Sequence, residues 1–272
     1  MIVDAHHHFW DPARADYSWM TDELAPIRRA FGPDDLRPLL ERRGIDRTVL
    51  VQTRSSVDET RELLATAAAT DFVAGVVGWV DLAAPDVADA LDALREGPDG
   101  RWLVGIRHQV HDEPDPDWLV RPDVLRGLRA VGEAGLAYDL LVRPRELPAA
   151  LTAARALPDV RFVVDHCAKP RVRDGADPEW AERLEPLAGL PNVVCKLSGL
   201  VTEADWRRWT PADLGPILSR VLDWFGPERV LIGSDWPVCL LAGSYDQVLD
   251  ALPPLPAAAL GGNAARVYRL QA

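Results

Sequence analysis

The chain has 272 residues, 48% of them hydrophobic, which is enough to bury a large core and fits one α/β barrel or two smaller domains. Its formal net charge of −12 disfavours binding to nucleic acid or to an anionic membrane surface. Because no apolar run approaches the roughly 20 residues that a membrane helix needs, we expect no membrane span.

Cysteine usage and the first residues of the chain indicate the compartment. Cys167, Cys195 and Cys239 stand far apart without CxxC spacing, which argues against a disulfide framework and suits a reducing environment. The sequence starts without the basic and apolar regions of a secretory signal. We therefore expect a cytoplasmic protein. We also expect either a monomer or a homodimer.

The first element in chain order is residues 3–10, VDAHHHFW, a buried strand that runs into three histidines. Because alternate side chains of a strand share a face, His6 and His8 are predicted to point one way and His7 the other. Two adjacent imidazoles can hold a metal ion or clamp an anionic or carbonyl group. A tag remnant is disfavoured, because tags are longer and do not follow an apolar strand.

Residues 11–33 are interrupted by three prolines and are predicted to be irregular, packed on the body through Tyr17, Trp19 and Met20 as a roof over the site. From there, apolar strands and helical patterns alternate. The predicted helices are 34–43, 57–70, 85–95, 122–133, 146–156, 178–188, 211–225 and 261–270. The predicted strands after the first are 48–52, 72–80, 103–109, 136–142, 161–166, 193–198 and 229–235.

This alternation predicts a parallel sheet with crossover helices. Eight such units in one chain of this length favour a single (β/α)₈ TIM barrel of the α/β class, spanning 1–272, over a doubly wound sheet. No GxGxxG or GxxxxGK[ST] pattern follows a strand, so the nucleotide-binding alternatives lack their phosphate loop.

Barrel enzymes place their chemistry at the carboxyl ends of the strands, and polar and aromatic residues gather there in this sequence. For Gln52, Lys196 or His111 taken singly, a structural role is an equal alternative. The convergence of His6, His8, His166 and Asp235 is harder to explain without chemistry. The full set is His6, His8, Trp10, Gln52, Trp79, Arg107, His108, His111, Tyr138, Asp139, Asp165, His166, Lys169, Lys196, Ser198, Ser234, Asp235 and Trp236.

Asp4, His6 and His8 form a D-x-H-x-H pattern after the first strand, and with His166 on the sixth strand and Asp235 on the eighth the chain resembles the amidohydrolase superfamily. More narrowly, it resembles the amidohydrolase-related branch of L-fuconolactonases, L-rhamnonolactonases and 2-pyrone-4,6-dicarboxylate lactonases. The stretches that carry this resemblance run through nearly the whole chain: DAHHHFWDP at 4–12, GIRHQVHDEPDPDWL at 105–119, YDLLVRP at 138–144, VVDHCAKP at 163–170, CKLSGLVTEADW at 195–206 and GSDWPVCLL at 233–241.

The chain also departs from the superfamily pattern. Many amidohydrolases bridge two metals with a modified lysine or a glutamate on the fourth strand, with a further histidine on the fifth. Here the fourth strand offers Arg107 and His108, and the fifth offers Tyr138 and Asp139. The resemblance therefore implies one divalent metal at most, and some members of this branch work without any.

The resemblance implies hydrolysis of a lactone, most simply a sugar-derived aldonolactone, in carbohydrate catabolism. The reaction needs an activated water, stabilisation of the oxyanion and a proton for the leaving alkoxide. Asp235 is the predicted base, with His166 as its catalytic partner. A metal on His6, His8, His166 and Asp235 would be zinc, with manganese as the alternative. Without metal, the same imidazoles would donate hydrogen bonds to the carbonyl oxygen.

The remaining strand-end residues are predicted to contact the substrate. Arg107 supplies a fixed charge and parallel donors that suit hydroxyls, a carboxylate or an ester carbonyl. The aromatic residues could stack on a sugar ring, with core packing as an equal alternative. The predicted contacts are Arg107, His108, Lys196, Tyr138, Gln52, Trp10 and Trp236, and Trp79 is a further candidate of this kind.

Two rival classes remain open at this point. A metal-dependent decarboxylase of the same superfamily would also use D-x-H-x-H, a later histidine and an aspartate, although the DHCAKP and KLSGL stretches favour the lactonase branch. A non-catalytic ligand-binding barrel would be expected to have lost part of the constellation. None of the four central residues is missing from this sequence.

Overall fold

A computed structural model describes residues 1–175 and 177–271. Within them, eight strands form one parallel sheet in which each strand pairs with the next in the chain. The strands are β1 (Val3–His7), β2 (Arg47–Val51), β3 (Val73–Gly78), β4 (Leu103–His108), β5 (Ala137–Leu140), β6 (Arg161–Val164), β7 (Val193–Leu197) and β8 (Val230–Ile232).

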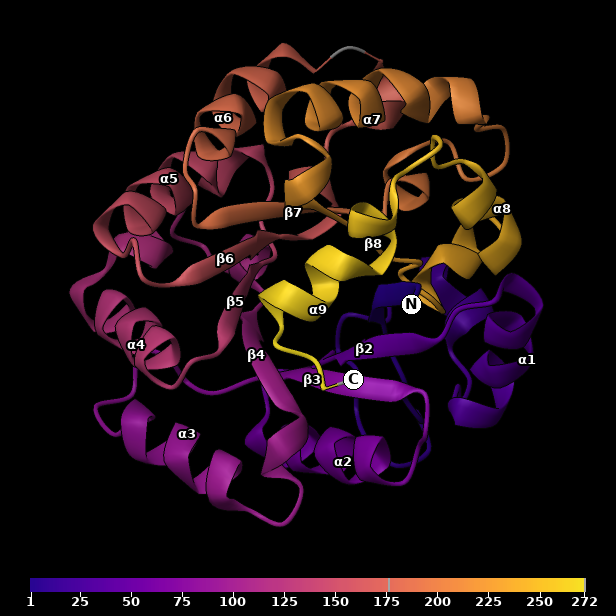
Figure 1. Cartoon of the computed structure of the whole chain (residues 1–272). Helices are drawn as coiled ribbons and strands as arrows, with labels where there is room; N and C mark the ends of the chain where they lie inside the picture. The colour runs from indigo at the N-terminus through magenta and orange to yellow at the C-terminus, as the bar shows by residue number, and fades with distance from the viewer. Residues whose placement is uncertain (176, 272) are drawn as a thin grey trace.

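Helices surround these strands (Figure 1). They are α1 (Pro33–Arg43), α2 (Val57–Ala68), α3 (Val87–Glu96), α4 (Pro122–Glu133), α5 (Leu147–Ala156), α6 (Pro178–Ala188), α7 (Pro211–Phe225), α8 (Tyr245–Asp250) and α9 (Asn263–Val267). None of the helices among the described residues is long and apolar enough to cross a membrane.

The sheet closes where the last strand meets the first. The backbone N–H of Asp235 donates to the carbonyl of His6 at 2.8 Å, and that of His8 donates to the carbonyl of Trp236 at 2.7 Å. Main-chain bonds of this kind continue the pairing of β1 past the end of β8. The predicted (β/α)₈ barrel is therefore confirmed, and the carboxyl ends of β1 and β8 are neighbours.

The strands are apolar on both faces because each is covered on both sides. Along β2, Val49 and Val51 point into the barrel, whereas Leu50 packs under the helices. Side chains from α9 fill the amino-terminal end of the barrel, where Val267 and Tyr268 join the interior cluster. Figure 1 shows α9 lying across this end.

Capping residues mark the ends of several helices. Ser56 accepts a hydrogen bond from the backbone N–H of Glu59 at the start of α2. Thr210 and Asp213 form a capping box before α7, whose first residue is a proline. Gly44, at φ 62°, ends α1 in the left-handed conformation that glycine adopts without strain.

Most predicted elements coincide with the observed ones, and α4, α6 and α7 match the predicted bounds. Two differences bear on the site. The predicted strand 229–235 ends at Ile232, because the chain turns at Ser234 and Asp235, and Asp235 has a φ of 56°. The predicted strand 161–166 ends at Val164, and residues 165–168 form a tight turn. Helix α8 was not predicted, and the predicted tail helix 261–270 is shortened to α9.

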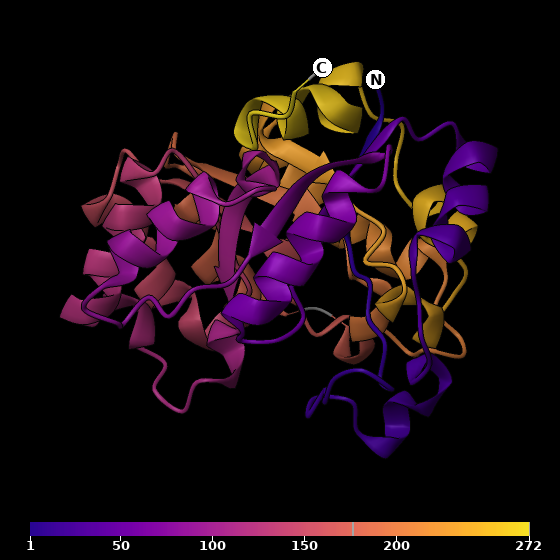
Figure 2. The ribbon, with the colours of Figure 1, turned by 90° about the horizontal axis from the view of Figure 1, so that it is seen from below.

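The two termini lie at one end of the barrel, and the segment 11–33 lies at the other, as Figure 2 shows by its indigo colour. Trp10 fastens this segment by donating its indole N–H to the carbonyls of Ile27 and Arg29, at 3.1 and 3.0 Å. Trp19 and Leu24 of the segment line a cavity at the carboxyl ends of the strands. The prediction that residues 11–33 cover the site agrees with this placement.

Candidate active site

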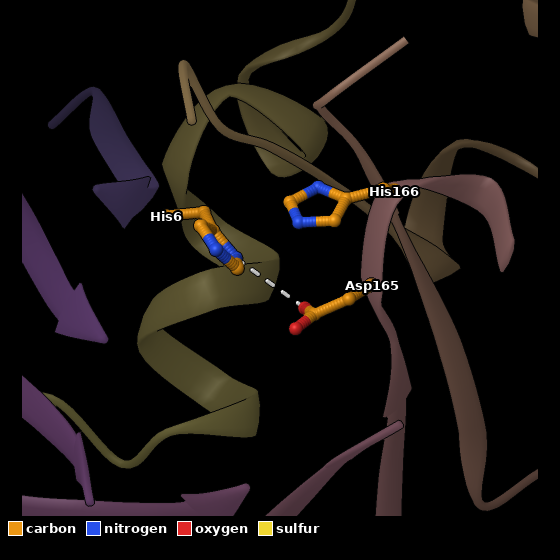
Figure 3. Close-up of side chains that lie close together, drawn as sticks. All are labelled: His6, Asp165 and His166. Atoms are coloured by element: carbon orange, nitrogen blue, oxygen red, sulfur yellow. Dashed lines mark ion pairs between the residues drawn. The ribbon is translucent and has the colours of Figure 1, made fainter. Parts of the chain in front are cut away.

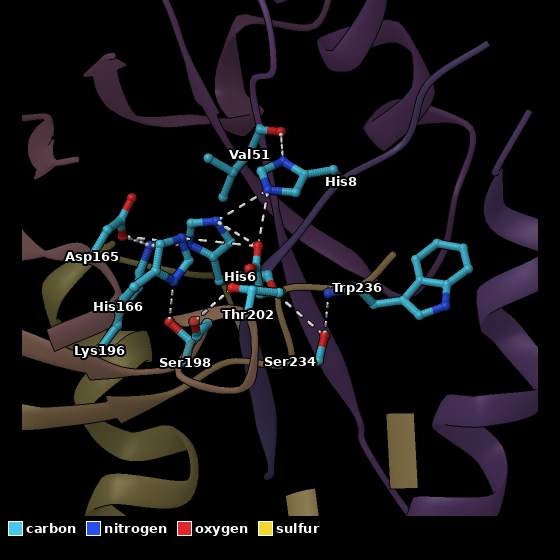
Figure 4. A network of polar contacts seen from close by, with 12 residues as sticks. His6, His8, Val51, Asp165, His166, Lys196, Ser198, Thr202, Ser234 and Trp236 are labelled. Atoms are coloured by element: carbon cyan, nitrogen blue, oxygen red, sulfur yellow. Dashed lines mark hydrogen bonds and ion pairs between the residues drawn. The ribbon is translucent and has the colours of Figure 1, made fainter. Parts of the chain in front are cut away.

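His6, His8, His166 and Asp235 meet at the carboxyl ends of β1, β6 and β8. One carboxylate oxygen of Asp235, Oδ1, lies 3.7 Å from Nε2 of His6, 3.4 Å from Nε2 of His8 and 3.9 Å from Nε2 of His166. The two Nε2 atoms of His6 and His8 are 3.2 Å apart. The four residues that the sequence predicted to converge therefore surround one point, and Figure 4 shows the three imidazoles turned towards one another.

The other ring nitrogen of each imidazole is held by a neighbour. Nδ1 of His8 lies 2.7 Å from the carbonyl of Val51, so Nδ1 carries the proton and Nε2 turns its lone pair to the cluster. Nδ1 of His166 lies 2.9 Å from Oγ of Ser198. Nδ1 of His6 lies 3.4 Å from Oδ1 of Asp165, as Figure 3 shows. Such outer partners fix the ring orientation.

The turn after β6 brings His166 to the cluster through an unusual backbone. His166, Cys167, Ala168 and Lys169 all have positive φ values, between 51° and 58°. Backbone in this region costs free energy for residues other than glycine and concentrates at functional sites. Gly199 makes room for the ring, because a Cβ at this position would stand 2.4 Å from Nδ1 of His166.

Asp235 is held as an ionised carboxylate. Burial alone would raise its pKa, but the imidazoles of His166, His8 and His6 outweigh burial and keep it below the ordinary value. The buried Asp4 fixes the preceding residue, because its carboxylate accepts from the N–H of Ser234 at 2.9 Å and from its hydroxyl at 2.6 Å. Asp4 of the D-x-H-x-H pattern thus ties β1 to the turn that carries Asp235.

The imidazoles of His6 and His166 are neutral near pH 7. Burial lowers the pKa of His166 to about 4. Burial, with the charges of Lys196 and His166, holds the pKa of His6 well below its usual range despite the nearby Asp165. A neutral imidazole presents either a lone pair or a single N–H from each ring nitrogen, so it suits a metal ligand or a hydrogen-bond donor.

Arg107 lies beside the cluster in a fixed orientation. Its Nη2 donates to the backbone carbonyl of Gln52 at 2.5 Å and to the side-chain oxygen of Gln52 at 3.1 Å. Its Nη1 donates to Asp165 at 3.0 Å and lies 3.3 Å from Nε2 of His6. Gln52 is fully buried, so it acts on the site by holding the guanidinium.

Lys196 lies inside the barrel beneath the cluster. Its Nζ contacts Asp139 at 2.5 Å, Asp165 at 3.0 Å and Nδ1 of His6 at 3.2 Å, and its side chain is 0% exposed. The hydroxyl of Tyr268 donates to Asp139 from the opposite end of the barrel, at 2.7 Å. Burial raises the pKa of Asp139 to about 6, although Lys196 lowers it. Lys196 thus connects Asp139, Asp165 and His6 beneath the cluster.

A cavity of about 380 Å³ opens above the cluster. His8, Arg107, His166 and Asp235 line it, whereas the other residues predicted as metal ligands or substrate contacts do not occur in its lining among the described residues. The lining also includes Trp19, Leu24, Thr53, Gln109, His111, Asp112, Leu141, Arg143, Lys169, Thr202, Glu203, Trp206, Val238 and Leu241.

The remaining predicted substrate contacts lie in other surroundings. Tyr138 is 0% exposed on the outer face of β5, where it packs against Phe162 under the helices, and Trp236 packs against Phe31 with its indole turned away from the imidazoles in Figure 4. Nε2 of His108 lies 2.8 Å from Glu113, while the indole N–H of Trp79 donates to its Nδ1 at 2.9 Å. In these positions the side chains support the structure around the cavity and do not line it.

Sequence reasoning did not select several cavity residues as substrate contacts. Lys169 and Arg143 both contact Glu203, at 2.9 and 3.4 Å, and His111 stands near them. Burial, with the nearby Lys169 and Arg143, lowers the pKa of His111 to about 2. The signal was present in the stretches DHCAKP and KLSGLVTEADW, where Lys169 and Glu203 follow the ends of strands β6 and β7.

His7, on the opposite face of β1, is expected to make stability fall in acid. Burial lowers its pKa to about 3, and its Nε2 lies 2.8 Å from Oγ1 of Thr48. Below the pKa of about 6.5 that His7 has in the unfolded chain, the unfolded chain binds a proton on His7 that the folded chain does not bind. The free energy of unfolding therefore falls as pH drops from 6.5 towards 3. The loss from His7 at pH 5 should be about 2 kcal/mol.

Urea unfolding at pH 7 and pH 5 checks this, with His7→Gln as the comparison because glutamine does not titrate there. The variant should lose less free energy of unfolding between the two pH values than the parent. Equal losses in both proteins would contradict the assignment of this titration to His7.

Comparison with known proteins identifies the family. The amidohydrolase family model matches residues 3–270, and the chain belongs to this family. It is 43% identical to an L-fucono-1,5-lactonase of Burkholderia ambifaria, over 98% of this chain and 95% of that protein. It is 42% identical to an L-fucono-1,5-lactonase of Burkholderia multivorans, over 98% and 96%. An amidohydrolase of Burkholderia multivorans crystallised with bound zinc superposes with a TM-score of 0.93 at 40% identity, covering 100% of both chains.

Proposed function

We propose that this protein hydrolyses a sugar-derived lactone to its hydroxy acid. The observation that carries the proposal is the ionised Asp235 facing three imidazoles and the Arg107 guanidinium at the base of a cavity. The cavity volume of about 380 Å³ suits a small ring. The likeness to two L-fucono-1,5-lactonases over nearly their full length supports a lactone as substrate.

Each chemical requirement of lactone opening has a residue placed to meet it. Asp235 accepts the proton of the attacking water and returns it to the leaving alkoxide. His166 lies beside Asp235, lines the cavity and orients the water with it. Arg107 is anchored by Gln52 and Asp165, so its charge is in place before the oxyanion develops and costs no reorganisation.

The cluster fits a single divalent metal. Ligand atoms bonded at about 2.0–2.2 Å to one tetrahedral ion stand roughly 3.3–3.6 Å apart. Nε2 of His6, Nε2 of His8 and Oδ1 of Asp235 are 3.2 to 3.7 Å from one another, and outer partners hold the imidazoles. His6, His8 and Asp235, with His166 beside them, would hold zinc, or manganese as the alternative. A bound ion would acidify water or polarise the carbonyl.

Metal analysis of protein prepared without chelator is expected to find at most about one ion per chain. Arg107 and Lys196 flank His6, and their two positive charges would repel a second cation at this position. His8→Ala should reduce the bound metal, whereas His108→Ala, outside the cluster, should not. Two ions per chain would contradict the mononuclear site.

The function is tested with a panel of aldono-1,5-lactones and carboxylated lactones, followed with a pH indicator. We expect acid release with L-fucono-1,5-lactone or a close analogue, and product analysis should find the hydroxy acid without carbon dioxide. Carbon dioxide release from an aromatic acid, with no lactone opened, would support a decarboxylase instead. Ligand binding without turnover would support a non-catalytic barrel. Assembly as a monomer or homodimer in the cytoplasm stays a prediction.

A further inference from the structure

One wall of the cavity is apolar. Leu24, Val238 and Leu241 line it, and each is partly exposed towards the open space. Leu24 comes from the short 3₁₀ helix Asp22–Ile27 within the segment 11–33, and the other two come from the 3₁₀ turn Val238–Leu241 after β8. These two segments pack against each other, so the three side chains belong to one continuous wall.

This wall is fixed relative to the proposed base. The N–H of Cys239 donates to the backbone carbonyl of Asp235 at 2.9 Å, and Cys239 is fully buried. Side chains three residues apart on a 3₁₀ turn stand above one another, so Val238 and Leu241 present one face. That face borders the same cavity as the Asp235 carboxylate.

Another part of the lining is polar. Arg143, Lys169, His111 and Glu203 line the cavity from the loops after β4, β5, β6 and β7. Ion pairs join Glu203 to both Lys169 and Arg143, and such charged groups donate to and accept from sugar hydroxyls. The cavity thus has a polar part suited to a hydroxylated ring and an apolar wall suited to an alkyl group.

We propose that Leu24, Val238 and Leu241 form an apolar subsite for the alkyl substituent next to the ring oxygen of the lactone. The assignment rests on the proposed function. In a 1,5-lactone the carbonyl carbon and C5 are both bonded to the ring oxygen. A group on C5 therefore lies close to the carbon that the water at Asp235 attacks. Side chains anchored to Asp235 are well placed to meet it, and the substrate class is a 6-deoxyaldono-1,5-lactone.

The expected selectivity follows from the character of the wall. A methyl group on C5 removes apolar surface from water against these side chains. A hydroxymethyl group in its place brings a hydroxyl to a wall of alkyl side chains, where it loses hydrogen bonds to water without replacing them. An apolar pocket discriminates against a substrate that adds a hydroxyl by roughly 10²-fold, and we expect a preference for the methyl substrate of at least tenfold.

The test measures kcat/KM for L-fucono-1,5-lactone and for the lactone that differs only in carrying a hydroxymethyl group on C5. Their ratio is independent of the fraction of folded enzyme. Leu241→Asn, close in size but polar, should reduce the preference at least threefold, and the near-isosteric Val238→Thr should act in the same direction. Leu240→Asn, on the same turn but outside the cavity lining, should keep the parent ratio.

Equal kcat/KM values for the two lactones in the parent enzyme would overturn the subsite while leaving lactone hydrolysis intact. An unchanged ratio in both Leu241→Asn and Val238→Thr would do the same. A folded parent that opens neither lactone would overturn the proposed function itself, and the subsite with it. A parent preference for the methyl lactone that both wall variants weaken and Leu240→Asn retains supports the assignment.

Discussion

Asp235→Asn is expected to lower kcat by roughly 10²–10⁴, the usual size of a general-base contribution. Asparagine keeps the shape of the side chain and can still accept hydrogen bonds, but it cannot take a proton from water. Because the turn around residue 235 is held by backbone bonds and by Asp4, the fold should be unaffected. Lactone hydrolysis and the midpoint of thermal unfolding, measured on the same preparation, separate the two effects.

Asp112→Asn is the matched control for this variant. Asp112 is a second carboxylate in the cavity lining, but its Oδ1 lies 3.3 Å from Nε2 of His111, and among the described residues it is not grouped with the histidines of the cluster. Its replacement should change kcat less than tenfold, well below a general-base contribution. If Asp235→Asn opens its lactone at close to the parent rate, Asp235 is not the base and the mechanism proposed here is wrong.

Lys196→Met is expected to destabilise the protein by about 3–5 kcal/mol, because it leaves the buried Asp139 and Asp165 without their shared cation. Lys196 is 0% exposed and contacts both carboxylates within 3.0 Å. Methionine fills a similar volume but carries no charge. Denaturant unfolding at pH 8 measures the loss, which should shrink at pH 5 because a protonated carboxyl has no charge to bury.

Two further variants show whether the unpaired charge causes the loss. Adding Asp139→Asn to Lys196→Met should recover part of the stability, since it removes one of the two carboxylates. Arg37→Met breaks an ion pair with Asp71 at the surface and should have a far smaller effect, because water screens exposed charges. A loss for Lys196→Met as small as that for Arg37→Met would mean that the buried network contributes little.

The sequence alone was sufficient for the alternation of strands and helices. Apolar runs bounded by proline and glycine are local signals, and α7 shows how far they reach. Its helical pattern predicted the observed bounds, and the structure shows a proline start and a capping box of Thr210 with Asp213 at its beginning. Local signals fail where tertiary contacts determine the backbone conformation, and the end of β8 is an example. Residues 233–235 were predicted as strand, but they turn towards β1 because Asp4 accepts hydrogen bonds from Ser234 across the closing barrel.

The sequence by itself also determined which four residues converge, because D-x-H-x-H, the histidine after β6 and the aspartate after β8 all lie at carboxyl ends of parallel strands. Only the tertiary structure decided what the other strand-end residues do. Lys196 points into the closed barrel and Tyr138 points outwards under the helices, whereas Lys169 and Glu203 reach the cavity from loops. Strand alternation gives two faces, but burial and ion pairing between residues far apart in the chain depend on how all the strands close around them.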